Sequence, residues 1–499
     1  MKNKLSSDLK GKITNLTNKY EKKEIVFISG KFNFIHPGHL RLINFAKSCG
    51  DILIVGLYDD DYSEVFVCEK DRSSSLTELE AIDEVFVFPN ESLVEVIKDL
   101  RPSIVVKGRE FSNMTNLEKT TIEEYGGRLL FSADEAKFSS RDLIRKELLG
   151  TSEIKNFKSD SLFLDRHSIL QSRLIDLLDS FSSLNVVVVG DLIIDEYVYC
   201  EALGMSQEDP TIVVSPIDTA RFVGGAGIVS AHVAGLGAKS TFITVVGDDD
   251  AGQAAKLSLE KYEVEHHFIT DSTRPTTLKQ RYRSGSKTLL RVNNLKSHDL
   301  GDKESAEFIH RFLSNIEQVD LVIFSDFNYG CLPQNLVDSI SQYCKKKKIP
   351  YFADSQASSQ MSDVSRFKGS KLISATEREV RLATNDFKSG IQQISNNLIK
   401  KAEAKNLIVK LGAEGLVALA NNPSYKTDSL VAFNSNPVDT AGAGDALLAT
   451  VALAKKLGAT IWEAAYLGNV AAAIQVSRLG NIPMKRSELV EVLMKKFAK

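Results

Sequence analysis

Residues 24–48 read EIVFISGKFNFIHPGHLRLINFAKS, and this stretch decides the fold of the N-terminal part of the chain. The segment Glu24–Ser29 (EIVFIS) is short, apolar and β-branched, as in a buried strand. The segment His39–Ser48 carries apolar side chains at helical spacing. The turn between them, Gly30–His39, contains two glycines and a proline. A strand that passes through a glycine-containing turn into a helix predicts one βα unit of a parallel sheet.

The same alternation continues almost to the end of the chain and predicts an α/β fold with two doubly wound parallel-sheet domains. Further strands are expected at Asp51–Gly56, Val85–Phe88, Ile104–Val106 and Arg128–Phe131, with a closing helix at Ser140–Leu149. A second series begins at Asn185–Gly190 and continues at Ser240–Val246, Val319–Ser325, Ile349–Asp354, Ser370–Ser374 and Asn406–Lys410, before three helical stretches from about 444 to 498. We therefore expect domains at 1–150 and 185–499, joined by a helical linker over 151–184 with one helix at Leu162–Leu184.

Composition limits the classes of partner and compartment. The 499 residues carry a formal net charge of −3, which predicts no nucleic-acid partner. No apolar run reaches the ~18 residues of a membrane span, and the N-terminus lacks the apolar core of a signal peptide. The five cysteines are scattered and form no CxxC pair, which favours a reducing, cytoplasmic setting.

The first candidate site is the turn itself, GKFNFIHPGH. His36 and His39 fall on the first turn of the expected helix, where unpaired N–H groups and the helix dipole favour anions. Two imidazoles at that point can hydrogen-bond phosphate oxygens, and Gly38 lets a nucleotide approach the backbone. The alternatives are a pair of exposed histidines or an accidental HxxH metal pair.

This turn resembles the HxGH signature of the cytidylyltransferase-like nucleotidyltransferases, over about residues 24–148. The resemblance implies that a sugar or polyol phosphate attacks the α-phosphate of a nucleoside triphosphate, with His36 and His39 acting on the departing pyrophosphate. It also implies nucleotide contacts from Gly30, Phe32, Gly38, Ser139 and Ser140, the last two in KFSSRDLI. The chain departs from the family at Asn33, where aspartate is common, and in a short 58–83 region, where Arg72 is the candidate for a missing arginine.

The second candidate site is Asp439–Asp445, DTAGAGD, which precedes a helical run of small apolar residues. A glycine-rich turn that feeds a helix N-terminus presents backbone amides to an anion. Asp445 could accept the proton of a hydroxyl that attacks ATP. The simpler alternative is a helix of small residues that begins next to a capping aspartate.

DTAGAGD resembles the C-terminal signature of the ribokinase-like (PfkB) carbohydrate kinases, and Gly224–Gly237 (GGAGIVSAHVAGLG) resembles their N-terminal signature. The resemblance implies Asp445 as the base, a Mg²⁺ ion held by Glu379 through water, and Asp195 with Gly224 and Gly225 at the sugar. The nucleotide and phosphate contacts that it implies are Thr376, Glu379, Gly412, Gly415, Thr440, Gly442, Ala443 and Gly444.

A narrower resemblance is to the bifunctional enzymes of ADP-heptose synthesis, which join a heptose-7-phosphate kinase to a heptose-1-phosphate adenylyltransferase. It rests on 190–214, on RPTTLKQRYRSGSKTLLR at 274–291 and on SDFNYGCL at 325–332. It implies substrate contacts from Lys279, Arg281 and Arg291. The chain departs from that family in its reversed domain order and at three positions, Ile228, Thr376 and Gln356.

The sequence therefore predicts an enzyme that phosphorylates a sugar phosphate with ATP and transfers a nucleotidyl group from ATP or CTP to a sugar 1-phosphate. Its partners would be small-molecule sugar phosphates and nucleotides, and the resemblance allows a homodimer. One alternative is a kinase and cytidylyltransferase for another phosphorylated sugar or polyol. The other is that one domain is degenerate and serves as a nucleotide-binding regulatory or scaffold module.

Overall fold

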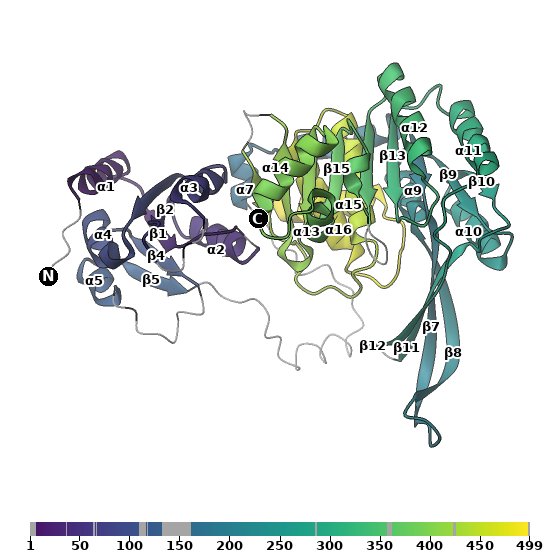
Figure 1. Ribbon diagram of the computed structural model, residues 1–499, viewed down its shortest axis with the longest axis horizontal. Helices are drawn as coiled ribbons and strands as arrows, with labels where there is room; N and C mark the ends of the chain where they lie inside the picture. Colours follow the sequence, from purple (N-terminus) through teal and green to yellow (C-terminus); the bar gives the residue numbers. More distant parts are fainter. Residues whose placement is uncertain are drawn as a thin grey trace. The chain divides into compact units, whose positions relative to one another are not determined.

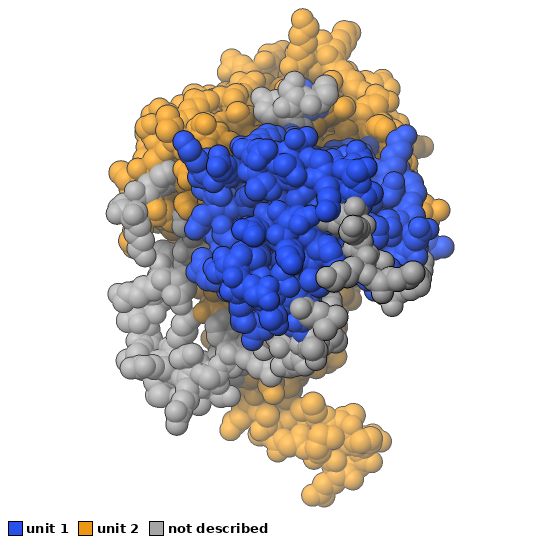
Figure 2. All heavy atoms as spheres, turned by 90° about the vertical axis from the view of Figure 1, so that its left-hand side faces the viewer, with its two compact units in different colours: residues 1–153, 386–396, 422–431 blue, residues 154–385, 397–421, 432–499 orange. Residues whose placement is uncertain are grey.

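The computed structural model describes residues 6–35, 37–62, 65, 67–108, 116, 118–131, 161–284, 287–356, 362–422 and 426–497. They form two compact units, coloured separately in Figure 2. The first unit holds residues 1–153, 386–396 and 422–431, and the second holds 154–385, 397–421 and 432–499. The predicted closing helix at Ser140–Leu149 lies outside the described residues.

The first unit is built on a parallel sheet with strand order β3-β2-β1-β4-β5. Its strands are β1 (Ile25–Gly30), β2 (Ile52–Tyr58), β3 (Glu84–Phe88), β4 (Ile104–Lys107) and β5 (Arg128–Phe131). Its helices in this part of the chain are α1 (Ser7–Lys19), α2 (Pro37–Lys47), α3 (Glu69–Thr77), α4 (Leu93–Leu100) and α5 (Lys119–Glu124), with a 3₁₀ turn η1 (Asn90–Ser92). The strand order reverses between β1 and β4, which places the ligand crevice of such a sheet outside their carboxyl ends.

Burial of one apolar stripe per helix holds these layers together. In α4 the side chains of Val96, Ile97 and Leu100 are buried against a cluster that includes Phe27 and Phe88. Each such side chain contributes roughly 1.5–3 kcal/mol relative to an exposed position. The left-handed Arg101 (φ 48°) then ends the helix before β4.

A nine-stranded sheet has the order β10-β9-β6-β13-β14-β15-β16-β17-β18; its first eight strands belong to the second unit, and β18 falls in the range 422–431 of the first unit. Its strands are β6 (Asn185–Gly190), β9 (Lys239–Val246), β10 (Glu265–Thr270), β13 (Leu321–Asp326), β14 (Tyr351–Ser355), β15 (Leu372–Thr376), β16 (Asn406–Lys410), β17 (Leu416–Ala420) and β18 (Asp428–Leu430). The pairings from β10 through β16 are parallel, and β17 is antiparallel to β16. This confirms the α/β class with mainly parallel sheets, and the switch in strand order here lies between β6 and β13.

The helices of this half of the chain follow the βα alternation. They are α7 (Ser161–Arg166), α8 (Gln171–Ser180), α9 (Ala226–Gly235), α10 (Asp250–Lys261), α11 (Asp302–Ser314), α12 (Gln334–Lys347), α13 (Glu377–Thr384), α14 (Ile391–Ala402), α15 (Ala443–Lys456), α16 (Ile461–Gln475) and α17 (Arg486–Phe497), with 3₁₀ turns η3 (Phe181–Ser183), η4 (Val364–Arg366) and η5 (Gly412–Glu414). The single helix expected at Leu162–Leu184 is wrong in detail, because Ser168 adopts a left-handed conformation (φ 50°) that separates α7 from α8. The three C-terminal helical stretches are confirmed as α15, α16 and α17.

A smaller four-stranded sheet was not expected. Its order is β12-β11-β7-β8, with β7 (Leu192–Met205), β8 (Ile212–Gly225), β11 (Thr277–Ser284) and β12 (Lys287–Asn294). Figure 1 shows β7 and β8 as a long ribbon that leaves the body of the second unit.

Among the described residues, no helix combines the length and the apolar character needed to cross a bilayer.

Candidate active sites

The first site forms where β1 ends and α2 begins. Phe32 lies in this turn with φ 45°, a conformation that costs a non-glycine residue of order 1 kcal/mol or more and that concentrates at functional sites. Its buried ring packs on the ring of His39, with centroids 5.0 Å apart. Gly30 accommodates that ring, because a Cβ at Gly30 would lie only 3.1 Å from it.

A backbone carbonyl fixes the orientation of His39. The His39 Nδ1 atom lies 3.0 Å from the carbonyl oxygen of Phe34. Because a carbonyl can only accept, Nδ1 carries the hydrogen, which leaves Nε2 as the ring nitrogen that can meet a ligand. The first turn of α2 holds Gly38 and no acidic residue, so the helix N-terminus keeps its preference for anions. His36, Ser139 and Ser140 lie outside the described residues.

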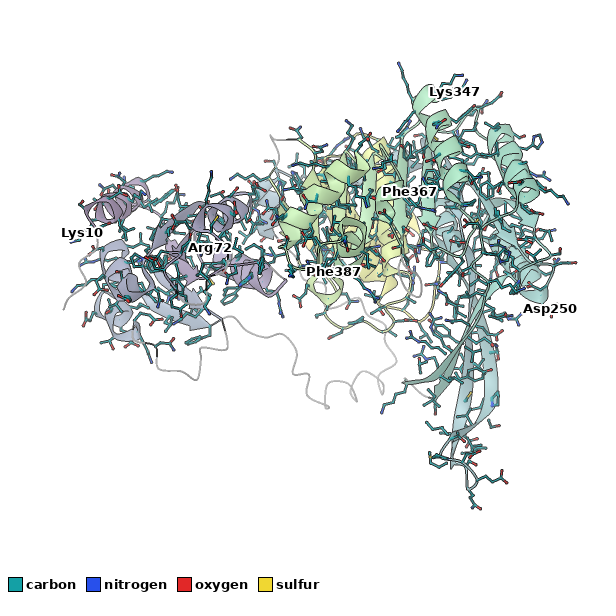
Figure 3. All side chains as sticks on the ribbon, viewed as in Figure 1. Lys10, Arg72, Asp250, Lys347, Phe367 and Phe387 are labelled. Carbon is teal, nitrogen blue, oxygen red and sulfur yellow. The ribbon has the colours of Figure 1, made fainter. Side chains whose placement is uncertain are left out.

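Arg72 takes a different place from the one expected of a phosphate-binding arginine. It sits on α3 with its side chain wholly buried, and Figure 3 labels it within the first unit. Its guanidinium donates to the carbonyls of Val67 (2.6 Å), Lys31 (2.8 Å) and Tyr58 (2.8 Å), and to the Asp60 carboxylate (2.7 Å). Arg72 therefore ties the turn after β1 to the turn after β2, because Lys31 directly follows Gly30.

The second site forms at the start of α15. Gly442 is left-handed (φ 74°) and lets the turn enter the helix without a side-chain cap, so the first amides of α15 remain for a ligand. Asp439 braces the turn by accepting hydrogen bonds from the amides of Ala441 and Gly480, both at 3.1 Å. The Tyr197 hydroxyl of β7 donates to the same carboxylate at 2.7 Å. Of the other predicted members, Ala443 and Gly444 lie in this turn and Thr440 is exposed beside it.

Asp445 is buried in the first turn of α15, with 6% of its surface exposed. Burial is the main cause that raises the pKa of its carboxyl to about 7, and the negative charges of Asp354 and Asp195 add to the rise. The positive charges of Lys410 and Lys279 oppose it. A carboxyl with a pKa near neutrality matches the requirement for a general base at physiological pH.

A cluster of acidic residues lies beside Asp445. The Asp354 carboxylate, at the end of β14, accepts a hydrogen bond from the Lys410 ammonium at the end of β16. Burial raises the pKa of Asp354 to about 6, and the nearby Glu379 adds to the rise while Lys410 opposes it. Glu379 forms a capping box with Thr376, whose backbone N–H donates to its Oε2 at 2.6 Å. Within the described part of the chain, no three acidic, cysteine or histidine side chains gather closely enough to form a metal centre.

The small sheet brings the predicted sugar residues to this site. One oxygen of the buried Asp195 carboxylate accepts from Arg281 and the other from Asn481 Nδ2 at 3.0 Å. Gly224 keeps room for Asp195, since a Cβ there would lie 2.5 Å from Oδ2. Gly225 is left-handed (φ 60°) and begins α9.

The remaining predicted residues, and Ile228, have surroundings that bear on their roles. The Lys279 ammonium lies over the rings of Phe327 (5.5 Å) and Tyr329 (5.2 Å). Arg291 is exposed on β12, where it pairs in register with Arg281. Ile228 is completely buried in α9. The glycines Gly412 and Gly415 lie in the η5 turn after β16, both with positive φ.

Sequence reasoning missed Asp191, Lys410 and Asn481, which shape the second site, and it gave Asp439 of the predicted turn no role of its own. Asp191 follows β6 and accepts hydrogen bonds from the amides of Phe327 (2.7 Å) and Cys331 (3.2 Å), so it holds the loop on which Phe327 lies. Arg274 donates to the Tyr329 carbonyl of that loop at 2.9 Å. Asp191 could have been predicted from the sequence, because it follows the carboxyl end of a central strand, where ligands bind in such sheets.

Comparison with known proteins finds two family models that match different parts of the chain. Residues 183–487 match the pfkB family carbohydrate kinase model and residues 27–157 match the Cytidylyltransferase-like model. The chain is 30% identical over 316 residues to "Bifunctional protein HldE" of Koribacter versatilis, and 32% identical over 321 residues to the protein of that name from Caulobacter vibrioides. Each of these alignments covers 62% of this chain and 63% of the relative.

Solved structures support the fold of the second unit. Arabidopsis thaliana ribokinase complexed with ribose and ATP is 20% identical with a TM-score of 0.50, and the match covers 62% of this chain and 98% of that one. Phosphofructokinase-2 from Escherichia coli in complex with potassium is 14% identical with a TM-score of 0.53, covering 63% and 99%.

Proposed function

Because this chain belongs to the pfkB family of carbohydrate kinases, we propose that its second unit transfers the γ-phosphoryl group of ATP to the anomeric hydroxyl of a phosphorylated sugar. We further propose that its first unit transfers a nucleotidyl group from ATP or CTP to the resulting sugar 1-phosphate and releases pyrophosphate. A heptose 7-phosphate is the first substrate that we propose, by similarity to the HldE proteins.

The buried Asp445 at the opening of α15 carries the kinase proposal. Its carboxylate accepts the proton of the attacking hydroxyl, and its pKa of about 7 leaves a substantial ionised fraction at neutral pH. The amides of Gly442–Asp445 stabilise the negative charge of the phosphoryl group in transfer. Catalysis then consists of positioning and charge stabilisation, with no covalent enzyme intermediate.

The environment of Lys279 supports a phosphorylated acceptor. Among the described residues it forms no ion pair, whereas Arg281 is paired with Asp195 and Lys410 with Asp354. Its ammonium is held over two aromatic faces, an attraction worth roughly 0.5–2 kcal/mol, and keeps its charge for an anionic group. We assign Lys279 to the substrate phosphate and Asp195 to sugar hydroxyls.

Magnesium would enter with ATP. Glu379 is 5% exposed and its carboxylate oxygens are of the type that Mg²⁺ prefers, so it fits a water-mediated contact with the ion. The ion would neutralise phosphate charge there.

In the first unit, the proposed chemistry uses the positive end of α2 and the imidazole of His39. With Nδ1 donating to the Phe34 carbonyl, the protonated imidazole of His39 would donate from Nε2 to phosphate oxygens on the side of the departing pyrophosphate. His36, Ser139 and Ser140 keep their proposed roles in phosphate binding.

Substitution of Asp445 by asparagine tests the kinase assignment. We expect kcat for ADP formation with a sugar phosphate to fall at least ~10²-fold, with ATP binding nearly unchanged, because only the proton acceptor is lost. The matched control is Asp250→Asn, an exposed aspartate in the first turn of α10 (Figure 3), which should leave kcat unaltered. An Asp445→Asn enzyme with the parental rate would refute the assigned role.

The completely buried Ile228 favours a second candidate substrate. It offers no hydrogen bond to a sugar hydroxyl, so another phosphorylated sugar or a polyol phosphate, with CTP as nucleotidyl donor, is the alternative. A panel of sugar and polyol phosphates with ATP or CTP, with products identified by mass, separates the two. The cytoplasmic location and the homodimer remain predictions.

A further inference from the structure

Lys410 places a buried ammonium directly beneath the phosphate-binding turn. It is the last residue of β16, and its backbone pairs in register with Thr376 of β15. A Cβ at Gly444 would lie 3.3 Å from Lys410 Nζ, so the ammonium touches the turn that opens α15. Only 13% of the Lys410 side chain is exposed.

The hydrogen bonding of this ammonium is incomplete. A lysine ammonium has three N–H donors, and burying a donor without an acceptor is costly. Among the described residues, Lys410 Nζ donates to Asp354 Oδ2 and to no other acceptor. Its remaining donors and the adjoining amides of α15 therefore lie together, which is the chemistry that binds a phosphate oxygen.

The charges around Lys410 keep it protonated. Burial lowers the pKa of the ammonium, but the carboxylates of Asp354, Glu379 and Asp445 outweigh burial and raise it. Gln356, which follows β14 where a lysine is common in the family, is neutral. Lys279 lies on the acceptor side, over Phe327 and Tyr329, so Lys410 has a different position and a different partner.

Resting on the kinase activity proposed above, we propose that Lys410 is a further catalytic residue, whose ammonium binds the γ-phosphate of ATP and stabilises its negative charge during transfer. In that step the sugar oxygen forms a bond to the γ-phosphorus, and the bond from this phosphorus to the β–γ bridging oxygen breaks. ADP leaves with that electron pair, Asp445 takes the hydroxyl proton, and Lys410 retains its own proton throughout.

The test uses the full chain and replaces the pair together. Lys410→Met alone would leave the Asp354 charge buried and unpaired, which destabilises the fold around the site. The double variant Asp354→Asn/Lys410→Met removes both charges and is expected to fold. Lys410→Arg keeps the charge, and Lys405→Met, an exposed lysine just before β16, is the matched control.

We expect the double variant to lose roughly 10²–10³-fold in kcat for ADP formation, with KM for the sugar phosphate within about threefold of the parent, as for loss of one transition-state donor. Asp354→Asn alone should retain a larger share of the activity than the double variant. The kcat of Lys410→Arg should be at least about tenfold higher than that of the double variant. A double variant with kcat within threefold of the parent, or a loss confined to KM for the sugar, would overturn the assignment.

The pH dependence of kcat/KM distinguishes a catalytic lysine from a structural one. Loss of a purely structural lysine would shift this pH dependence in no defined direction. The charged groups that act on Asp445 are Asp354, Lys410, Asp195 and Lys279. Because Lys410 lowers the pKa of Asp445, the double variant should have the acidic limb of its kcat/KM profile at higher pH than Asp354→Asn alone. Asp354→Asn alone should have this limb at lower pH than the parent, because the Asp354 charge raises the pKa of Asp445, and shifts in the reverse sense would contradict the assignment.

A binding experiment separates this inference from the proposed function. If the parent forms no ADP with any acceptor, the proposed kinase activity fails, and titration with the ATP analogue AMP-PNP then decides the role of Lys410. The first unit is identical in the parent and the double variant, so any difference in affinity belongs to the second unit. At least tenfold weaker binding of AMP-PNP, with binding of adenosine unchanged, supports the contact, and equal affinity overturns it.

Discussion

Replacement of Arg72 by methionine should destabilise the first unit and disorder the turn between β1 and α2. Methionine preserves the apolar part of the side chain but removes the donors to the carbonyls of Lys31, Tyr58 and Val67. Each carbonyl left without a donor costs roughly 1 kcal/mol or more. Asp60 is about half exposed (46%) and stays solvated, so its lost ion pair adds little.

The expected loss is therefore about 3 kcal/mol of unfolding free energy. For a unit of this size, 1 kcal/mol corresponds to roughly 2–4 °C in melting temperature, which gives a decrease of about 6–12 °C. Nucleotidyl transfer should also slow, because the Lys31 carbonyl anchors the turn that leads to His39.

Calorimetry of the full chain, combined with tryptophan fluorescence, measures this effect. Trp462 is the single tryptophan and lies in the second unit, so the transition that its fluorescence follows belongs to that unit and should not move. The matched control is Lys70→Met, an exposed lysine on the same helix α3. If Arg72→Met melts like Lys70→Met, the hydrogen bonds of Arg72 do not stabilise the turn and the reasoning is refuted.

Two further predictions concern the second unit. The Asp445 carboxyl has a pKa of about 7 in the fold against 3.8 when unperturbed, so the folded state binds more protons and the unit loses stability as pH rises from about 4 to 7. Asp445→Asn should therefore raise the free energy of unfolding, measured by urea denaturation, by up to about 4 kcal/mol at pH 8 and by less at pH 5, and equal gains at both pH values would contradict this. Gly190→Ala should prevent folding of the unit, because a Cβ at residue 190 would lie 1.8 Å from the Ser325 carbonyl oxygen. Gly412→Ala has nothing within 4 Å of its Cβ and should cost only about 1 kcal/mol of backbone strain. Similar circular dichroism melts for the two variants would argue against this packing.

The parts of the fold that could be predicted are those whose signal is local. The strand–turn–helix pattern identified β1 and α2, and DTAGAGD identified the opening of α15, because glycine and the apolar period act over a few residues. The four-stranded sheet was missed because β7 pairs in parallel with β11, some 80 residues later in the chain, and its exposed ends lack a clean alternation. Its pairing depends on contacts that no short window contains.

Charged residues were the least predictable part of the sites. Arg72 stands in a polar helix and Lys410 at the end of a strand, positions that are usually solvated. Whether such a side chain turns inward depends on acceptors brought from other elements, Lys31 and Tyr58 for Arg72 and Asp354 for Lys410. The roles of Asp445 and His39 could be proposed because both residues lie in the first turn of a helix that follows a glycine-containing turn. The free amides of such a turn favour an anion, so a polar side chain there is expected to face a ligand.

The two hydrogen bonds that join β7 to the start of α15 and its neighbours have a consequence for how this protein can evolve. Tyr197 and Asp195 lie on one strand, yet they hold Asp439 of the turn before α15 and Asn481. If this turn binds phosphate as proposed, we expect mutations on β7 that broaden sugar choice to lower turnover as well. Laboratory selection for a new acceptor should accumulate its first successful changes on β12, where the exposed Arg291 lies and where none of these hydrogen bonds is made.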